Sequence, residues 1–188
     1  MGVKDFKKDY VMAQDLEKLK YPIGLFHYPE KLDEVQINFW INQLEKFPQE
    51  LLAVTSNLSI PQLAAQYRPG GWTVRQVIHH VADSHVNAYT RVKLTLTEEN
   101  PVVRPYDEER WAELPDAKNG EIDLSVAIIE AIHHRLIITL RNLSLKDFER
   151  KYTHPALNRS LTLGYLVGNY AWHGQHHLAH ITAALSGT

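Results

Sequence analysis

Four long segments with helical periodicity limit most strongly the folds that this chain can adopt. In each segment apolar residues recur every three or four positions, and stretches rich in Pro, Gly or Asp separate one segment from the next. The predicted helices cover residues 32–58, 73–97, 124–143 and 161–185. Pro48 is expected to kink or split the first helix after Phe47. Four amphipathic helices of this length predict an all-α four-helix bundle.

The connections add two features to this bundle. Residues 1–30 carry mixed charge and are predicted to form an extended N-terminal arm, and a short helical turn is expected from Pro61. Residues 100–120 contain three prolines and form one long crossover loop. Loops of this length are uncommon without a functional reason. We expect one domain over residues 1–188, with a candidate functional segment in the loop.

Composition excludes several classes of function. The net charge of −2 gives no strong field of either sign, which argues against nucleic acid and anionic membranes and favours a small-molecule substrate. The first thirty residues lack the apolar core of a signal peptide, and no apolar run approaches the length of a membrane span. The chain has no cysteine, so neither disulfides nor thiolate ligands are available. These features predict a cytoplasmic protein.

The last predicted helix contains the densest group of histidines, in the stretch AWHGQHHLAHI. His173, His177 and His180 fall on its apolar stripe, whereas His176 lies at the edge of the stripe and is a weaker candidate. His173 and His177 are four residues apart, the spacing with which two histidines of a helix bind one metal ion. The alternative is that these rings only pack and hydrogen-bond in the core. Three inward imidazoles favour coordination, because each would otherwise carry a desolvation cost.

A third ligand is expected from the stretch VIHHVADSH on the second predicted helix. The helical wheel places His79 opposite the apolar stripe, His80 just outside its edge and His85 near its centre. The wheel therefore rejects His79, leaves His80 and His85 both open and slightly prefers His85. His133 and His134 lie mostly off the likely core face of the third predicted helix, and His27 and His154 lie in probable loops. These four histidines are expected to be structural or solvated.

Several separated motifs together resemble one known family. GWTVRQVIHHVADSH and YAWHGQHHLAHI resemble the DinB/YfiT-like metal-dependent enzymes, and PVVRPYDEERWAELPDA and YPIGLFHYPE resemble the YfiT branch in particular. The resemblance implies a four-helix bundle in which three histidines hold one divalent ion, Zn²⁺ or Ni²⁺. The family's motif positions correspond to His80, His173 and His177 in this sequence. Relatives that dimerise also make a homodimer the expected assembly.

Three imidazoles would leave an open position on such an ion, as in catalytic zinc sites. A metal-dependent hydrolase that activates water is therefore the expected function. An S-transferase that binds a low-molecular-weight thiol is the first alternative. A non-catalytic helical binding module with a structural metal, closed by His180, is the second. No side chain is assigned as catalytic, because metal-bound water or thiolate would be the reacting group.

No carboxylate is singled out by its spacing. Six are expected to be solvated: Asp83, Glu98, Glu99, Asp107, Glu108 and Glu109. Asp83 lies one turn from His80 and has a modest claim to orient that ring. In the long loop, Arg104, Tyr106 and Trp111 are candidates to line or cover the site.

Overall fold

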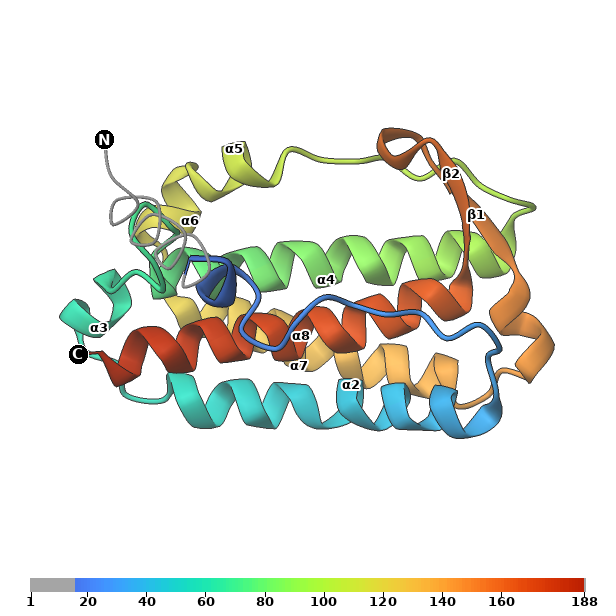
Figure 1. The fold of residues 1–188 in the computed structure, drawn as a ribbon, viewed down its shortest axis with the longest axis horizontal. Coiled ribbons are helices and arrows are strands. Elements are labelled where there is room, and N and C mark those ends of the chain that lie inside the picture. The colour runs from blue at the N-terminus through green and yellow to red at the C-terminus, as the bar shows by residue number, and fades with distance from the viewer. Residues whose placement is uncertain (1–15, 188) are drawn as a thin grey trace, which may run out of the picture.

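Four long helices form the body of the protein in the computed structural model, which describes residues 16–187. They are α2 (Glu34–Thr55), α4 (Val74–Thr97), α7 (Ile122–Leu140) and α8 (Leu163–Ser186). Helices α2 and α4 each pack against both α7 and α8 (Figure 1). The predicted all-α four-helix bundle is confirmed. Residues 1–15 of the predicted arm, and Thr188, lie outside the described residues.

Local sequence explains where these helices begin. Thr73 is the N-cap of α4, and its hydroxyl accepts a hydrogen bond from the Gln76 N–H while the Gln76 side chain reaches back to the Thr73 N–H. This reciprocal pair satisfies two N–H groups that a helix N-terminus leaves unpaired. Asp33 and Thr162 cap α2 and α8 with side-chain oxygens that accept hydrogen bonds from the N–H groups of Gln36 and Tyr165.

Pro48 lies within α2 without splitting it, so of the two predicted effects, a kink or a split after Phe47, the split is wrong. Proline has no N–H, and the carbonyl of Leu44, four residues earlier, therefore lacks its usual helical donor. That carbonyl accepts a hydrogen bond from His133 Nδ1 of α7, at 2.7 Å. The helix continues because a side chain replaces the missing backbone donor.

The order of the helices requires a long crossover. Helices α2 and α8 run in one direction and α4 and α7 in the other, so the chain returns along the bundle between α4 and α7 (Figure 1). This crossover contains two short helices, α5 (Glu108–Ala112) and α6 (Pro115–Asn119), which both pack against α4. Before α4, the turn expected from Pro61 is the short helix α3 (Ile60–Ala64).

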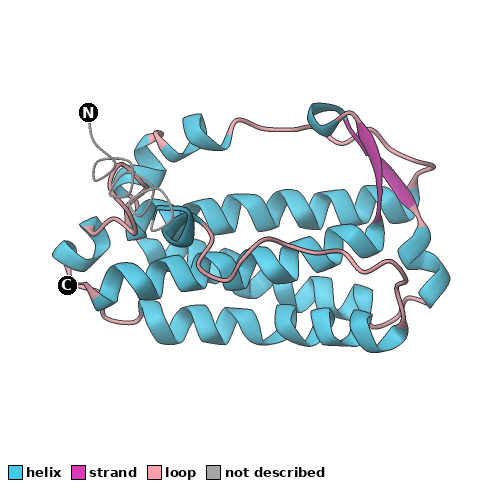
Figure 2. Cartoon of the chain, viewed as in Figure 1, coloured by secondary structure: helices cyan, strands magenta, loops and turns pink. Residues whose placement is uncertain are grey.

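The connection from α7 to α8 contains structure that the sequence analysis did not predict. A 3₁₀ turn, η1 (Leu145–Glu149), precedes an antiparallel ribbon of β1 (Lys151–His154) and β2 (Arg159–Thr162). A second turn, η2 (Pro155–Leu157), joins the two strands (Figure 2). The ribbon adds to the helical fold without changing its class.

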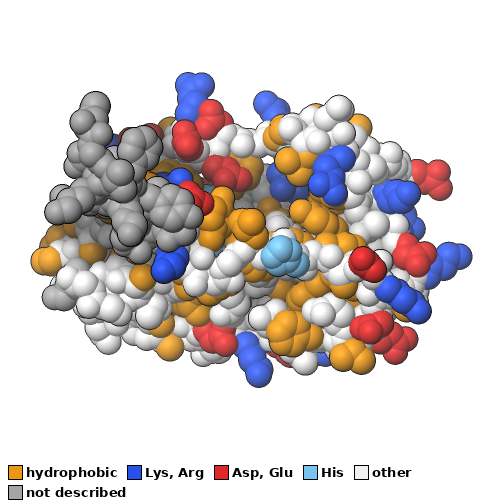
Figure 3. Space-filling view, in the orientation of Figure 1, with side chains coloured by type: hydrophobic (Ala, Val, Ile, Leu, Met, Phe, Trp, Pro, Cys, Tyr) orange, Lys and Arg blue, Asp and Glu red, His pale blue; other side chains and the backbone are white. Residues whose placement is uncertain are grey.

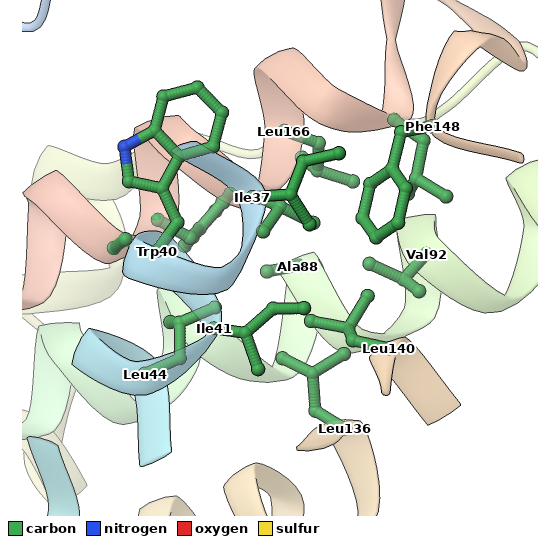
Figure 4. Packing of buried hydrophobic residues seen from close by; sticks show 14 of the residues in the cluster. Ile37, Trp40, Ile41, Leu44, Ala88, Val92, Leu136, Leu140, Phe148 and Leu166 are labelled. Carbon is green, nitrogen blue, oxygen red and sulfur yellow. The ribbon is translucent and has the colours of Figure 1, made fainter. Parts of the chain in front are cut away.

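The bundle interior consists of two apolar clusters. The first cluster joins the beginnings of α2 and α8 to the ends of α4 and α7 and includes Ile37, Trp40, Val92 and Leu140 (Figure 4). The second fills the opposite end and includes Phe47, Ile78, Ile129 and Ile181. Along the chain, His85 of α4 and His133 of α7 lie between members of the two clusters, whereas His79 and His80 lie among members of the second.

The described part of the N-terminal arm lies along α8 (Figure 1). Trp172 Nε1 donates a hydrogen bond to the Gly24 carbonyl at 3.2 Å, and the Phe26 ring meets Tyr165 edge-on at 5.4 Å. The face drawn in Figure 3 shows acidic and basic side chains interspersed. Among residues 16–187 no helix combines the length and hydropathy of a membrane span.

Gly168 brings α8 close to α2. A Cβ atom at this position would lie 2.7 Å from Cζ2 of Trp40, closer than van der Waals contact allows. We predict that Gly168→Ala lowers the free energy of unfolding by about 1–3 kcal/mol, because the overlap outweighs the gain of roughly 1 kcal/mol in helix propensity. Urea unfolding measures this change. Adding Trp40→Phe should recover part of the loss, and an equally stable Gly168→Ala protein would contradict the predicted overlap.

Candidate metal centre

Three imidazole rings from two helices converge near the middle of the bundle. His80 lies on α4, and His173 and His177 lie one turn apart on α8. One ring nitrogen from each lies within 4.8 Å of the others. The ring centroids of His80 are 5.4 Å from His173 and 4.8 Å from His177, and those of the α8 pair are 4.5 Å apart. The structure thus brings together the three residues that the family resemblance indicated.

Burial keeps these rings neutral. His80 and His177 are buried, and desolvation lowers the pKa of His80 to about 4. Desolvation, reinforced by neighbouring imidazoles, lowers the pKa of His173 and of His177 well below the usual value. Desolvation disfavours protonation of these rings, and each neutral imidazole keeps a lone pair that can bind a cation.

His173 is also joined to further buried histidines. His85 Nε2 lies 3.2 Å from His173 Nδ1, and His85 Nδ1 lies 2.8 Å from His133 Nε2. His133 is completely buried and contacts the Leu44 carbonyl of α2 described above. Each ring in this row comes from a different helix, so the hydrogen bonds connect all four long helices. The ring of His85 therefore lies beside the three converging rings, with both of its nitrogens engaged by other histidines.

His177 has a second neighbouring group on α8. His180 Nδ1 lies 3.4 Å from His177 Nδ1, and His180 Nε2 lies 3.1 Å from the carbonyls of both Leu19 and Lys20. His176, His177 and His180 also form a group with ring nitrogens within 4.8 Å of one another. His176 is buried, although the sequence placed it at the stripe's edge.

The three converging rings line a cavity of about 310 Å³. Its wall also includes Tyr67, Arg68, Trp72 and Glu108. The same four residues line an adjoining cavity of about 670 Å³, which extends away from the histidines. The Trp72 ring lies 4.7 Å from the His80 ring and forms the boundary between the apolar interior and this space. Together the two cavities offer a small molecule access to the imidazoles.

Two predictions about the remaining histidines are wrong. His79 was placed on the solvent face of its helix, but it is buried, and its ring contacts Ser125 Oγ at 2.8 Å and the Gly120 carbonyl at 3.2 Å. Helices α5 and α6 cover the side of α4 that a simple bundle would expose. His133 was placed off the core face, yet it is fully buried.

The position of His133 was recoverable from the sequence. Six buried residues of α7 follow the alternating spacing of four and three that marks a core stripe: Ile122, Val126, Ile129, His133, Leu136 and Leu140. Treating histidine as polar interrupted this pattern. His133 is a structural residue, as expected, but in the core of the protein.

One carboxylate of the crossover loop lines the cavity. Glu108 is exposed, as expected, but it also lies in the wall beside the histidines, and partial desolvation raises its pKa. Among the described residues, Arg104, Tyr106 and Trp111 are not part of that wall. Tyr106 and Trp111 pack against each other with ring centroids 4.6 Å apart. The loop therefore reaches the site through Glu108.

The comparisons with known proteins identify the class of this chain. Residues 43–181 match the family model of the DinB superfamily, and the chain belongs to this family. A protein of Oceanobacillus iheyensis is 53% identical over 87% of this chain and 94% of its own length, and one of Bacillus cereus is 48% identical over 89% and 96%. Both are named metal-dependent hydrolases, with the activity marked in each name as unproven.

One solved structure is closely similar to this chain. YfiT from Bacillus subtilis, described as a probable metal-dependent hydrolase with an unusual four-helix bundle topology, superposes with a TM-score of 0.85 at 45% identity. The match covers 88% of this chain and 94% of YfiT. The resemblance to the YfiT branch is confirmed.

Asp83 does not orient His80, because among the described residues no hydrogen bond joins the two. Burial, with a smaller contribution from the nearby Asp116, raises the pKa of Asp83 to about 6. When the pKa of a carboxyl group is higher in the folded protein than in the unfolded chain, its ionisation lowers the free energy of unfolding at pH values above the folded pKa. This loss of stability disappears below the pKa of the unfolded chain, where the group is protonated in both states.

Asp83→Asn should therefore stabilise the protein at pH 7.5, by about 1 kcal/mol after allowance for solvent screening, and should have little effect near pH 4. Thermal unfolding across this pH range measures the difference. Asp116→Asn is the matched control and should give a smaller gain, because Asp116 is only the lesser cause of the shift. A gain that is equal at both pH values would contradict burial of the Asp83 charge.

Proposed function

We propose that His80, His173 and His177 bind one divalent ion, Zn²⁺ or Ni²⁺, and that the protein is a metal-dependent hydrolase of a small molecule. One observation carries this proposal: three neutral imidazoles from two helices, two of them buried and that of His173 partly buried, converge on a cavity large enough for a ligand. The names of the relatives give the same class of activity. The proposal extends that class to these three residues of this chain.

The donor set fits such an ion. Imidazole nitrogens suit Zn²⁺ and Ni²⁺, and three of them leave a coordination position open, whereas structural zinc has four protein ligands. The ion, when bound, lowers the pKa of water and polarises a carbonyl group. The histidines hold and orient it within the bundle, where the rigid helices preserve their spacing.

The cavity wall supplies the remaining groups that a hydrolase needs. Glu108 is the carboxylate positioned to accept a proton from water, and its raised pKa brings it closer to neutral pH. Arg68 lies over the Tyr67 ring at 5.3 Å, and its Nε is buried with no hydrogen-bond partner among the described residues. We assign Arg68 to binding a polar group of the substrate and Trp72 to contacting its apolar part.

The proposed assembly is a homodimer. Val35 and Phe39 lie one turn apart on α2, and both side chains are largely exposed. An apolar helix face of this kind is suited to pairing with a second copy about a two-fold axis.

One matched pair of variants can distinguish a proposed metal ligand, His80, from the neighbouring buried histidine, His79. Untagged protein should contain about one equivalent of Zn²⁺ or Ni²⁺ per chain, and His80→Ala should lose most of it. His79→Ala removes an adjacent buried ring that contacts Ser125 and Gly120, and it should keep the metal. Elemental analysis measures both. Equal metal in the two variants would remove His80 from the site.

Hydrolysis and thiol transfer predict different substrate requirements for the same metal protein. Ester and amide substrates should be turned over without added thiol, and Glu108→Gln should lower kcat by about 10²–10⁴-fold at unchanged metal content. Glu109→Gln, its neighbour on α5, is the control. Turnover that depends strictly on a low-molecular-weight thiol and an electrophile would replace the hydrolase with the S-transferase.

A further inference from the structure

We propose that two chains of hydrogen bonds, called relays below, fix the tautomers of His173 and His177 so that Nε2 of each ring is left for the metal. The first relay runs from the Leu44 carbonyl through His133 and His85 to His173. The second runs from the Leu19 and Lys20 carbonyls through His180 to His177. His85, His133 and His180 are then positioning residues, which act on the ion through its ligands. This inference rests on the proposed function and concerns residues outside the proposed ligand set.

The first relay can be followed from its anchor. The Leu44 carbonyl can only accept, so His133 Nδ1 carries a hydrogen and donates it over 2.7 Å. A neutral imidazole has a single N–H, and His133 Nε2 is therefore an acceptor. It lies 2.8 Å from His85 Nδ1, which must be the donor of that pair.

The same reasoning, applied to the next hydrogen bond of the relay, gives the tautomer of His173. With its hydrogen on Nδ1, neutral His85 has an acceptor at Nε2, 3.2 Å from His173 Nδ1. His173 must then donate from Nδ1, and its own lone pair is on Nε2. A carbonyl of α2 thus determines the proton position on a ring of α8.

The second relay is shorter and reaches the other ligand of α8. The Leu19 and Lys20 carbonyls both lie 3.1 Å from His180 Nε2, so that nitrogen carries the hydrogen. His180 Nδ1 is left as an acceptor, 3.4 Å from His177 Nδ1. His177 donates from Nδ1 and also keeps its lone pair on Nε2.

The two relays give His173 and His177 the same tautomer, with the hydrogen on Nδ1. Without a partner, either nitrogen of a neutral imidazole can carry the hydrogen, and a ring with the wrong tautomer presents N–H to a cation. A hydrogen bond at the other nitrogen fixes both the tautomer and the orientation of a ligand ring, and loss of such partners typically costs 10–100-fold in metal affinity. The second relay also explains why His180 is a poor ligand for the neighbouring group of three histidines: its Nε2 is engaged by carbonyls.

Nitrogen NMR tests the relays on the unmodified protein. Long-range ¹⁵N–¹H correlation spectra distinguish rings protonated on Nδ1 from rings protonated on Nε2. In metal-free protein at pH 8, above the ordinary pKa of histidine of about 6.5, we expect Nδ1–H for His173, His177, His85 and His133, and Nε2–H for His180. Nε2–H at His173 or His177 would overturn the proposal. This measurement needs no variant, so it does not depend on a mutant that folds.

Zn²⁺ affinity, measured by competition with a fluorescent chelator, tests the function of the relays. His85→Phe and His180→Phe remove the acceptors and should each weaken Zn²⁺ binding 10–100-fold. His85→Gln places an amide oxygen near the position of Nε2, and His180→Asn places one near Nδ1, so these variants should recover most of the loss.

His79→Phe is the control, because it replaces another buried histidine of α4 that lies outside both relays; it should bind Zn²⁺ like the parent. Unchanged affinity in both Phe variants, or no recovery in the amide variants, would overturn the proposal. A parent protein that binds no Zn²⁺ would instead overturn the proposed function, and the tautomers of the metal-free rings would still decide whether the relays exist.

Discussion

The hydrogen bond from the His133 ring to the Leu44 carbonyl is the contact on which the polar interior depends. Pro48 removes the N–H that would normally bond this carbonyl, and leaving the buried oxygen unpaired would cost about 1–3 kcal/mol. His133 supplies the donor, which fixes its ring and, through it, the ring of His85. A proline that would ordinarily disrupt a helix interior therefore provides the fixed end of a row of imidazoles.

This row lies between two apolar clusters. Along α4, His85 falls between Ala82 of one cluster and Ala88 of the other, and along α7 His133 falls between Ile129 and Leu136. Packed hydrocarbon on both sides excludes water and strengthens each hydrogen bond of the row, while any unpaired nitrogen there would be costly. His85 and His133 are tolerated in the core because both nitrogens of each ring have a partner.

The sequence predicted those features that depend on local pattern. The cap at Thr73 and the i, i+4 pair of His173 and His177 were read from neighbouring residues, because caps and helix faces are short-range properties. His80 required the family resemblance, since a helical wheel cannot show how far a ring reaches toward another helix. The β-ribbon was missed because two strands of four residues carry little periodic signal. His79 was misplaced because its partners, Gly120 at the end of α6 and Ser125 of α7, are distant in sequence.

The candidate centre therefore has two unlike sides. On the inner side, the relays and the apolar clusters leave the α8 rings little freedom to move. On the outer side, Arg68, Trp72 and Glu108 come from the segment before α4 and from the crossover loop, and they border the two cavities. Loops can change these outer residues without disturbing the bundle, because few of the contacts that hold the inner rings involve them. The proposed ligands and the residues proposed to contact a substrate are therefore held by different parts of the chain, the first by the bundle and the second by its connections.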